Sequence, residues 1–435
     1  MTSTASLHFE TVITNARIIS PPQDVIDEGS IAISDGSIVA IAAHGTRWTA
    51  DTVIDARGRA VIPGLIDAHV HLHFRPEEDA VAYTQAAETI VSRKLEEYVK
   101  RGFTTVYSMA DYWPGLAAVR DRANLPGTVA PRILAAGPML SPVDGHCVHD
   151  FPRPDSEFGR TCGISREIDS PEQARQVVAE LAESGVDCIK IAHMGAEFAY
   201  PTDRRLGRFK PGVVQAICNA AHDHGLTVRA HTDPPSNALE CLEYGVAGLA
   251  HGPGMLGLWT PDTPEGAREY ELLLDTLVRR SIPVCTTLGV QTAVNDRWGA
   301  RRDVVYGRED LAALIDPESA GSDRAALDAA RLHKLGVIMA FGTDLIYLDS
   351  VHDAIDIELR LLNQAGLSPA EILTLATVNA ARYAERPDLG TISEGARADI
   401  VISGADPLAT TDFTNRIDLV MKDGRIIYDF EGALA

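Results

Sequence analysis

Hydrophobic positions in the middle of the chain follow a repeating pattern, in which a helix-like segment ends at glycine and an apolar run follows directly. Clear examples are Arg101-Gly-Phe-Thr-Thr-Val106, Ser184-Gly-Val-Asp-Cys-Ile189 and His224-Gly-Leu-Thr-Val228. Glycine supplies the left-handed residue that ends a helix, and a continuous apolar run is typical of a strand buried on both faces. The pattern therefore predicts parallel strands that alternate with helices.

Helix starts carry their own signals. Ser170-Pro-Glu and Ser368-Pro-Ala-Glu each place proline at the first helical position after a serine that can cap the helix. Eight strand candidates result, and eight such units favour a closed (β/α)8 TIM-type barrel within an α/β fold. The expected strands lie near residues 65–72, 103–108, 132–136, 186–191, 226–231, 246–251, 282–287 and 337–342.

Both ends of the chain look different, with short strands and Asp-Gly turns. Asp35-Gly36 and Asp423-Gly424 each join two apolar runs, as expected of hairpins. We expect both ends to pair into one small β-domain, so that residues 1–64 and 385–435 flank a barrel of residues 65–384. The stretches 141–169 and 289–320 lack periodicity and are interpreted as active-site loops, or as disordered insertions.

Composition narrows the function classes. The 435 residues include 39 basic and 61 acidic ones, giving a net charge of −22 without a basic cluster. Nucleic acid and anionic membranes are therefore unexpected partners, and no apolar run reaches the roughly 18 residues of a membrane span. The amino terminus lacks the features of a signal peptide, and the six cysteines are scattered. The sequence thus predicts a cytoplasmic protein with reduced thiols.

Candidate chemistry begins at Val61-Ile-Pro-Gly-Leu-Ile-Asp-Ala-His-Val-His-Leu-His73. Because side chains alternate along a strand, Asp67, His69, His71 and His73 share one face. Two imidazoles two residues apart on a rigid strand are able to bind one metal ion. The alternative is a strand end whose histidines are hydrogen-bonded core residues.

Polar residues also follow the other apolar runs, at Lys190, His231, His251 and Asp344. Each has a structural alternative: a strand-end lysine, two core histidines and a helix-capping aspartate. Barrel active sites form where the strands end, so together these residues favour a metal site at the barrel mouth. Imidazole and carboxylate ligands suit Zn²⁺, with Mn²⁺, Fe²⁺, Co²⁺ or Ni²⁺ as alternatives.

The succession of these residues along the chain resembles that of the amidohydrolase superfamily, and within it that of the binuclear imidazolonepropionase-like and prolidase-like hydrolases. The resemblance covers nearly the whole chain. Its motifs are Pro63-Gly-Leu-Ile-Asp-Ala-His-Val-His71, Ile189-Lys-Ile191, Ala230-His231, Ala250-His251-Gly252, Gly342-Thr-Asp344, Ala376-Thr-Val-Asn-Ala-Ala381 and Gly390-Thr-Ile-Ser-Glu-Gly-Ala-Arg-Ala-Asp399. It implies that the β-domain formed by both termini is a β-sandwich.

The resemblance also implies roles for the site residues. His69, His71 and Asp344 would hold one of two divalent metal ions, expected to be Zn²⁺, and His231 and His251 the other. Lys190 would bridge them as an N-carboxylated lysine, since a carbamate is an anionic oxygen ligand whereas an ammonium repels cations. Two cations would supply a hydroxide at neutral pH, and Asp344 would orient it and pass its proton to the departing amine.

Substrate contacts are less sharply marked. In relatives a Gly-His at the place of His146 lies near the substrate, so His146 is a candidate for substrate binding and catalysis. His193, Tyr200 and Arg204 follow the fourth strand and are further candidates, and an arginine there would bind a carboxylate bidentately. For each of them a surface or structural role is the alternative.

Three functions stay open at this point. The first is a binuclear hydrolase that cleaves a small amide-type substrate: an N-acyl amino acid, an Xaa-Pro-like dipeptide, or a related amide or carbamate. The second is a one-metal deaminase, cyclic-amide hydrolase or lactonase in which Lys190 is structural. The third is a catalytically idle barrel that serves in binding or assembly. We also expect a homo-oligomer.

Overall fold

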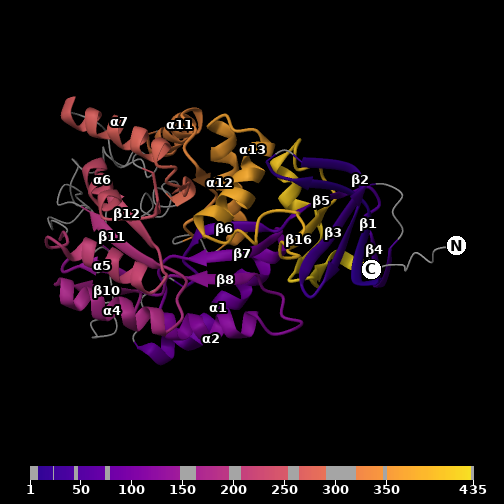
Figure 1. Ribbon diagram of the computed structural model, residues 1–435, viewed down its shortest axis with the longest axis horizontal. Coiled ribbons are helices and arrows are strands. Elements are labelled where there is room, and N and C mark those ends of the chain that lie inside the picture. The colour runs from indigo at the N-terminus through magenta and orange to yellow at the C-terminus, as the bar shows by residue number, and fades with distance from the viewer. Residues whose placement is uncertain are drawn as a thin grey trace, which may run out of the picture.

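The computed structural model describes residues 8–22, 24–43, 48–73, 79–146, 163–194, 207–252, 264–290, 320–345 and 350–432. These residues form a mixed α/β fold with three sheets. Figure 1 shows the sheet made from both chain ends at one end of the molecule, a three-stranded sheet in the centre, and a seven-stranded sheet with its helices at the other end.

The eight-stranded sheet joins the two ends of the chain, in the order β18-β17-β16-β5-β1-β2-β3 with β4 paired to β1. Its strands are β1 (His8–Ser20), β2 (Asp24–Ser34), β3 (Ser37–Ala43), β4 (Thr49–Asp55), β5 (Ala60–Pro63), β16 (Ile400–Ser403), β17 (Ile417–Lys422) and β18 (Arg425–Asp429). Isoleucines from both ends, such as Ile31 and Ile402, share one buried apolar cluster. The pairing of both termini in one sheet is thus observed, whereas a sandwich of two sheets and the boundaries at residues 64 and 384 stay predictions.

The other two sheets consist of parallel strands. The three-stranded sheet contains β6 (Leu65–Val70), β7 (Phe103–Ser108) and β8 (Arg132–Ala135). The seven-stranded sheet runs β10-β9-β11-β12-β13-β14-β15. Its strands are β9 (Met139–Pro142), β10 (Ser165–Ile168), β11 (Ile189–Met194), β12 (Val228–Asp233), β13 (Gly248–Leu249), β14 (Val284–Cys285) and β15 (Met339–Ala340).

Helices follow most of these parallel strands, and the glycine and serine signals lie at their ends. Ser170 and Ser368 cap two helices that begin with proline, as predicted, and Gly102 and Gly185 follow helix ends with φ of 86° and 82°. The α-helices are α1 (Ala80–Lys100), α2 (Trp113–Ala123), α4 (Pro171–Glu183), α5 (Val213–Asp223), α6 (Pro235–Glu243), α7 (Pro264–Arg279), α11 (Ala320–Lys334), α12 (Val351–Gln364), α13 (Pro369–Thr374) and α14 (Ala380–Tyr383). Shorter helical segments are the π-helix η1 (Leu375–Asn379) and the 3₁₀-helices η2 (Thr411–Asn415) and η3 (Phe430–Gly432).

Each of the eight strands expected from the sequence has a counterpart among β6, β7, β8 and β11 to β15. The stretch 141–169 differs from the prediction of loop alone, because Ser165 pairs with Met139 and Ile168 with Pro142 in two further parallel strands. Most of the stretch 289–320 lies outside the described residues. In the part of the chain that the structure describes, no helix combines the length and apolar character needed to cross a membrane.

Backbone hydrogen bonds connect the three-stranded sheet to the seven-stranded sheet on both sides. The amide of Ala68 in β6 donates to Phe341 O (2.9 Å), just after β15. On the other side, the amide of Asp187 donates to Ala135 O of β8 (2.7 Å). These bonds bring the end of β15 beside β6, so that residues far apart in the sequence share one region.

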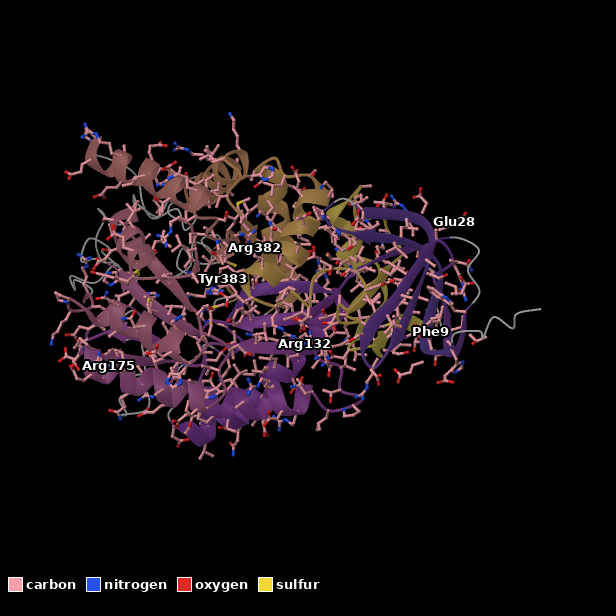
Figure 2. All side chains as sticks on the ribbon, in the orientation of Figure 1. Phe9, Glu28, Arg132, Arg175, Arg382 and Tyr383 are labelled. Atoms are coloured by element: carbon pink, nitrogen blue, oxygen red, sulfur yellow. The ribbon has the colours of Figure 1, made fainter. Side chains whose placement is uncertain are left out.

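Arg132 connects the three-stranded sheet to the eight-stranded sheet, between which it lies in Figure 2. Its guanidinium forms ion pairs with Asp399, which precedes β16, and with Asp423 in the turn between β17 and β18. A paired, largely buried guanidinium with several acceptors is well suited to join two elements. Arg132 therefore anchors the eight-stranded sheet to the three-stranded sheet, whose strand β6 contains the candidate ligand His69.

A second buried arginine, Arg229 of β12, provides a test of what holds the interior together. Its guanidinium donates to Tyr383 O and lies over the Tyr383 ring, 4.9 Å from the centroid. Arg229→Met removes the donor and leaves a buried carbonyl without its partner, so we expect unfolding in urea to become easier by about 2 kcal/mol. The exposed neighbour Arg382 provides the control, since Arg382→Met is expected to change stability by less than about 0.5 kcal/mol. Equal stabilities of the two variants would show that Arg229 does not stabilise the fold.

Candidate metal centre

The candidate site lies where the parallel strands end. His69 is in β6 and His71 directly follows it, Lys190 is in β11, and His231 is in β12. In the register of β11 and β12, Lys190 pairs with Arg229 and Ala192 with His231, so Lys190 and His231 point to the same face two residues apart. His251 and Asp344 follow β13 and β15 closely, and all six side chains are buried.

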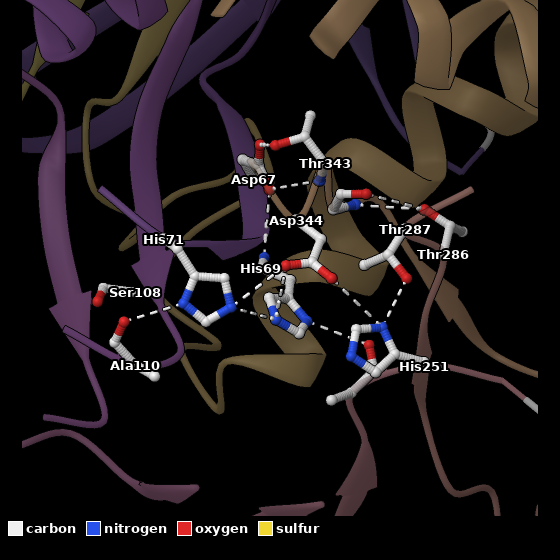
Figure 3. A network of polar contacts seen from close by, with 12 residues as sticks. Asp67, His69, His71, Ser108, Ala110, His251, Thr286, Thr287, Thr343 and Asp344 are labelled. Carbon is white, nitrogen blue, oxygen red and sulfur yellow. Dashed lines mark hydrogen bonds and ion pairs between the residues drawn. The ribbon is translucent and has the colours of Figure 1, made fainter. Parts of the chain in front are cut away.

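Four of the six side chains meet in one cluster, which Figure 3 shows from close by. His69 Nε2 lies 3.4 Å from His71 Nε2. Asp344 Oδ1 lies 3.2 Å from His71 Nε2 and 3.6 Å from His69 Nε2, and Asp344 Oδ2 lies 3.8 Å from His251 Nδ1. One ligand atom from each of His69, His251 and Asp344 lies within 4.8 Å of the others. This spacing is what a group of ligands around a cation requires.

Backbone carbonyls fix the orientation of two imidazoles. His69 Nδ1 donates to Ala250 O (3.1 Å), and His71 Nδ1 donates to Ala110 O (2.9 Å). With the proton held on Nδ1, each Nε2 keeps its lone pair and faces the cluster. Such outer hydrogen bonds are the usual companions of metal-binding histidines.

His231 and His146 extend the cluster on one side. The His231 ring lies 4.7 Å from the His251 ring and stacks on the His146 ring at 4.3 Å. Its Nε2 lies 3.1 Å from Met194 Sδ at the end of β11. The structure therefore brings His146, expected as a substrate contact, against His231, one of the second pair of candidate ligands.

Lys190 lies among these imidazoles and is only 1% exposed. Burial lowers the pKa of His69, His231 and His251 well below the ordinary histidine value, and the positive charge of Lys190 adds to the effect in all three. An ammonium in this position disfavours any cation nearby. The cluster is therefore suited to bind a metal ion only when Lys190 carries no positive charge.

Asp344 is ionised at neutral pH. Burial acts to raise its pKa, but the contact with His71 and the charges of His251 and Lys190 outweigh burial and hold the pKa below its ordinary value. Its backbone φ of 49° lies in the left-handed region, and its amide donates to His69 O (2.8 Å). Strained backbone of this kind is often found at functional sites.

Asp67, two residues before His69, lies beneath the cluster rather than in it. Its carboxylate accepts from Thr343 Oγ1 (2.7 Å), Thr343 N (3.1 Å), His69 N (3.2 Å) and Tyr98 OH (3.1 Å). Burial raises the pKa of Asp67 to about 7. Asp67 therefore connects the strand of His69 to the residue next to Asp344.

The structure does not gather all the predicted substrate contacts. His193 is buried beside helix α6, where Nε2 lies 3.2 Å from Glu240 Oε2 and its ring stacks on Phe209 at 5.7 Å. Burial lowers its pKa, against the opposing effect of Glu240. Tyr200 and Arg204 lie outside the described residues. A substrate role for these three residues stays a prediction.

Sequence reasoning missed three polar residues around the cluster. Asp111 accepts from the amides of Leu72 (3.0 Å) and His73 (2.8 Å), directly after His71. Thr287 Oγ1 lies 2.7 Å from His251 Nδ1, and Glu358 of α12 contacts the turn that contains Thr287. No sequence motif marks them, although Glu358 is an acid on an otherwise apolar helix face.

Comparison with known proteins decides the family. The model of the amidohydrolase family matches residues 60–258 and 263–427, which is most of the chain. The chain belongs to the amidohydrolase family. This amidohydrolase is accordingly a hydrolase that acts on carbon–nitrogen bonds.

Named relatives agree with this placement. The amidohydrolase is 27% identical to an imidazolonepropionase of Streptomyces griseus subsp. griseus, over 93% of each chain. A crystal structure of another amidohydrolase matches with a TM-score of 0.77 and 26% identity, over 97% of this chain and 99% of that one. The crystal structure of an Xaa-Pro dipeptidase with methionine in its active site matches with a TM-score of 0.75 and 22% identity, over 97% and 100%, and shows likeness of fold.

The residues of the cluster fit a metal ion. Among the described residues, the buried Asp344 Oδ1 accepts no hydrogen bond, although a buried carboxylate oxygen normally has a partner. His71 Nε2 lies 3.2 Å and His69 Nε2 lies 3.6 Å from this oxygen. A cation would satisfy all three atoms at once, because imidazole nitrogen and carboxylate oxygen are the ligands that Zn²⁺ and similar ions prefer.

Proposed function

We propose that this amidohydrolase is a binuclear metal-dependent enzyme that hydrolyses a small amide-type substrate. The candidates are N-acyl amino acids, Xaa-Pro-like dipeptides and related amides or carbamates. The observation that carries the proposal is the buried Lys190 among the imidazoles of His69, His231 and His251. A second metal ion needs an anionic bridge at this place, and N-carboxylation of Lys190 would supply one.

We infer that the parallel strands form a closed (β/α)8 barrel. The hydrogen bonds from Ala68 to Phe341 and from Asp187 to Ala135 support this arrangement, because they join the three-stranded and seven-stranded sheets on both sides. In such a barrel the carboxyl ends of the strands open into one mouth. All six proposed metal ligands would lie there.

Each residue has a distinct task in the proposed mechanism. His69, His71 and Asp344 would hold one metal ion, His231 and His251 the other, and carboxylated Lys190 would bridge them. Bound divalent ions, expected to be Zn²⁺, would lower the pKa of a water molecule and polarise the substrate carbonyl. Asp344 would accept a proton from the attacking water and transfer it to the departing amine, which its ionised state allows.

His146 is the best placed of the proposed substrate contacts. Its ring stacks on His231 and is 8% exposed at the edge of the cluster. From this position it would donate a hydrogen bond to a substrate carbonyl or carboxylate. His193, Tyr200 and Arg204 remain proposed contacts of lower priority, since His193 is directed toward Glu240. A cytoplasmic homo-oligomer is the setting that we propose for the enzyme.

A second candidate is a one-metal deaminase, cyclic-amide hydrolase or lactonase. The likeness to imidazolonepropionases over 93% of the chain supports a cyclic amide as an alternative substrate class. One ligand atom from each of His69, His251 and Asp344 lies within 4.8 Å of the others, and these three residues could hold a single metal ion. Lys190 distinguishes the two candidates, because only a binuclear site needs it as a ligand.

Metal analysis with a substrate screen tests the proposal. The purified protein is assayed for Zn, Mn, Fe, Co and Ni, then tested on N-acyl amino acids, Xaa-Pro dipeptides, carbamates, cyclic amides and lactones. We expect two metal equivalents per chain and amide hydrolysis that a chelator abolishes and added metal restores. One equivalent with full activity supports the second candidate. A metal-replete protein that is inert on every substrate class contradicts both and favours the idle barrel.

A further inference from the structure

Helix α12 carries one acid on its buried face. The other buried residues of this helix are apolar, and they are Val351, Ala354, Ile355, Leu359, Leu361 and Leu362. Glu358 is fully buried among them, at 0% exposure. A carboxyl group is placed in such surroundings at considerable cost, so its contacts are informative.

Glu358 is directed at the turn that follows β14. Its Oε2 accepts from the amide of Gly289 at 2.7 Å. Burial raises the pKa of Glu358 to about 7, while hydrogen bonds from Thr286, Leu288 and Gly289 act in the opposite direction. Helix and turn are in close contact, because a Cβ added at Gly289 would lie 3.2 Å from Ile357 Cγ2 and 3.4 Å from Glu358 Oε2.

The same turn presents a hydroxyl group to the candidate metal centre. Thr287 has a φ of 51°, which is unusual for a β-branched residue and needs support from its surroundings. Its amide donates to Gly342 O (3.0 Å), and its Oγ1 lies 2.7 Å from His251 Nδ1. If Nδ1 donates to this hydroxyl oxygen, His251 keeps the Nε2 lone pair for a metal ion.

We propose that Glu358 is a positioning residue for His251: it anchors the turn of residues 286–290, and Thr287 in this turn fixes the orientation and tautomer of the imidazole. The helix behind the sheet thereby controls one ligand of the metal centre. The inference rests on the proposed function, since it assigns His251 to metal binding. It adds two residues, Glu358 and Thr287, that do not touch the metal themselves.

Metal affinity measures this role directly. The readout is competition with a chromophoric chelator, using Zn²⁺ and Co²⁺, whose absorption spectrum reports ligand geometry. Glu358→Met removes both acceptor oxygens while keeping the volume, and we expect it to weaken one metal equivalent by roughly 10- to 100-fold. Glu358→Gln keeps an acceptor oxygen for Gly289 and is expected to stay within about threefold of the wild type.

A double-mutant cycle separates positioning from general support of the fold. Thr287→Val removes the hydroxyl group, and we expect a loss similar to that of Glu358→Met, whereas Thr287→Ser restores affinity. If Glu358 acts through Thr287, the double variant loses little more than either single variant. Additive losses, or a Glu358→Met protein with unchanged affinity for both metal equivalents, would overturn the inference.

Two further variants complete the experiment. Asp328 is a buried acid on helix α11 that accepts from Tyr270 OH (2.9 Å), and Asp328→Met is expected to change stability without changing metal affinity. Gly289→Ala displaces the same turn without removing an acid, so it tests the inference if Glu358→Met does not fold. Its unchanged affinity would then contradict the inference. Wild-type protein that binds no metal would instead refute the proposed function.

Discussion

Lys190→Ala is expected to lose most of its bound metal and to lower kcat/KM by at least about 1,000-fold, which corresponds to about 4 kcal/mol of transition-state stabilisation. The reason is the position of Lys190, buried among three imidazoles whose pKa its ammonium form would lower. A carboxylated lysine would reverse this charge and bridge two cations. Metal content and kcat/KM of the purified variant provide the measurement.

Chemical rescue and a matched variant make the Lys190 experiment decisive. Acetate or propionate is expected to restore part of the activity, because a small carboxylate is able to occupy the space of the missing carbamate. Lys100→Ala, at the exposed end of helix α1, is the control and is expected to behave as the wild type. A Lys190→Ala protein with normal metal content and activity would show that Lys190 is structural, in favour of a one-metal enzyme.

Asp344→Asn is expected to reduce kcat by about 100- to 10,000-fold, the range for loss of a general acid–base group. The change keeps the shape of the side chain but removes the charge and the proton-accepting oxygen. The expected metal loss is smaller than for Lys190→Ala, since an amide oxygen still faces His71 and His69. Parallel measurements of kcat, KM and metal content distinguish a lost proton acceptor from a lost ligand.

Asp353→Asn is the control for this variant, because Asp353 is exposed in the first turn of α12. It is expected to leave kcat unchanged. If Asp344→Asn retained its turnover at neutral pH, another group would have to move the proton. If it lost all metal, the lost activity would be explained by the loss of a ligand and would not support a role of Asp344 in proton transfer.

The local sequence was sufficient to predict the strands and helices that carry the candidate site residues. The alternation of Asp67, His69 and His71 places them on one face wherever the segment is a strand, because the side-chain period of a strand is two. Glycine after some helices, such as Gly102 and Gly185, and serine before others, such as Ser170 and Ser368, set the helix ends through their own backbone and side-chain preferences. For the same reason, the eight parallel strands were located to within a few residues.

Strands β9 and β10 were not predicted from the local sequence pattern, although they pair with each other in the seven-stranded sheet. Ser165 and Met139 are adjacent in the sheet, yet neither segment is long or alternating enough to be recognised as a strand. Such pairings depend on what each segment packs against. Pattern alone also could not distinguish one sheet from two at the chain ends, where the hydrogen bonds join all eight strands.

By itself, the sequence indicated the candidate ligands and the strand end near which each one lies. Tertiary structure alone decided how they are held: Asp67 of β6 accepts from Thr343, Asp111 accepts from the amides of the residues after His71, and Glu358 lies behind the turn of Thr287. The physical reason is range. A strand or a helix cap is set by neighbours in the chain, whereas a buried carboxylate accepts from amide and hydroxyl donors up to 276 residues away, and only the folded chain brings them together.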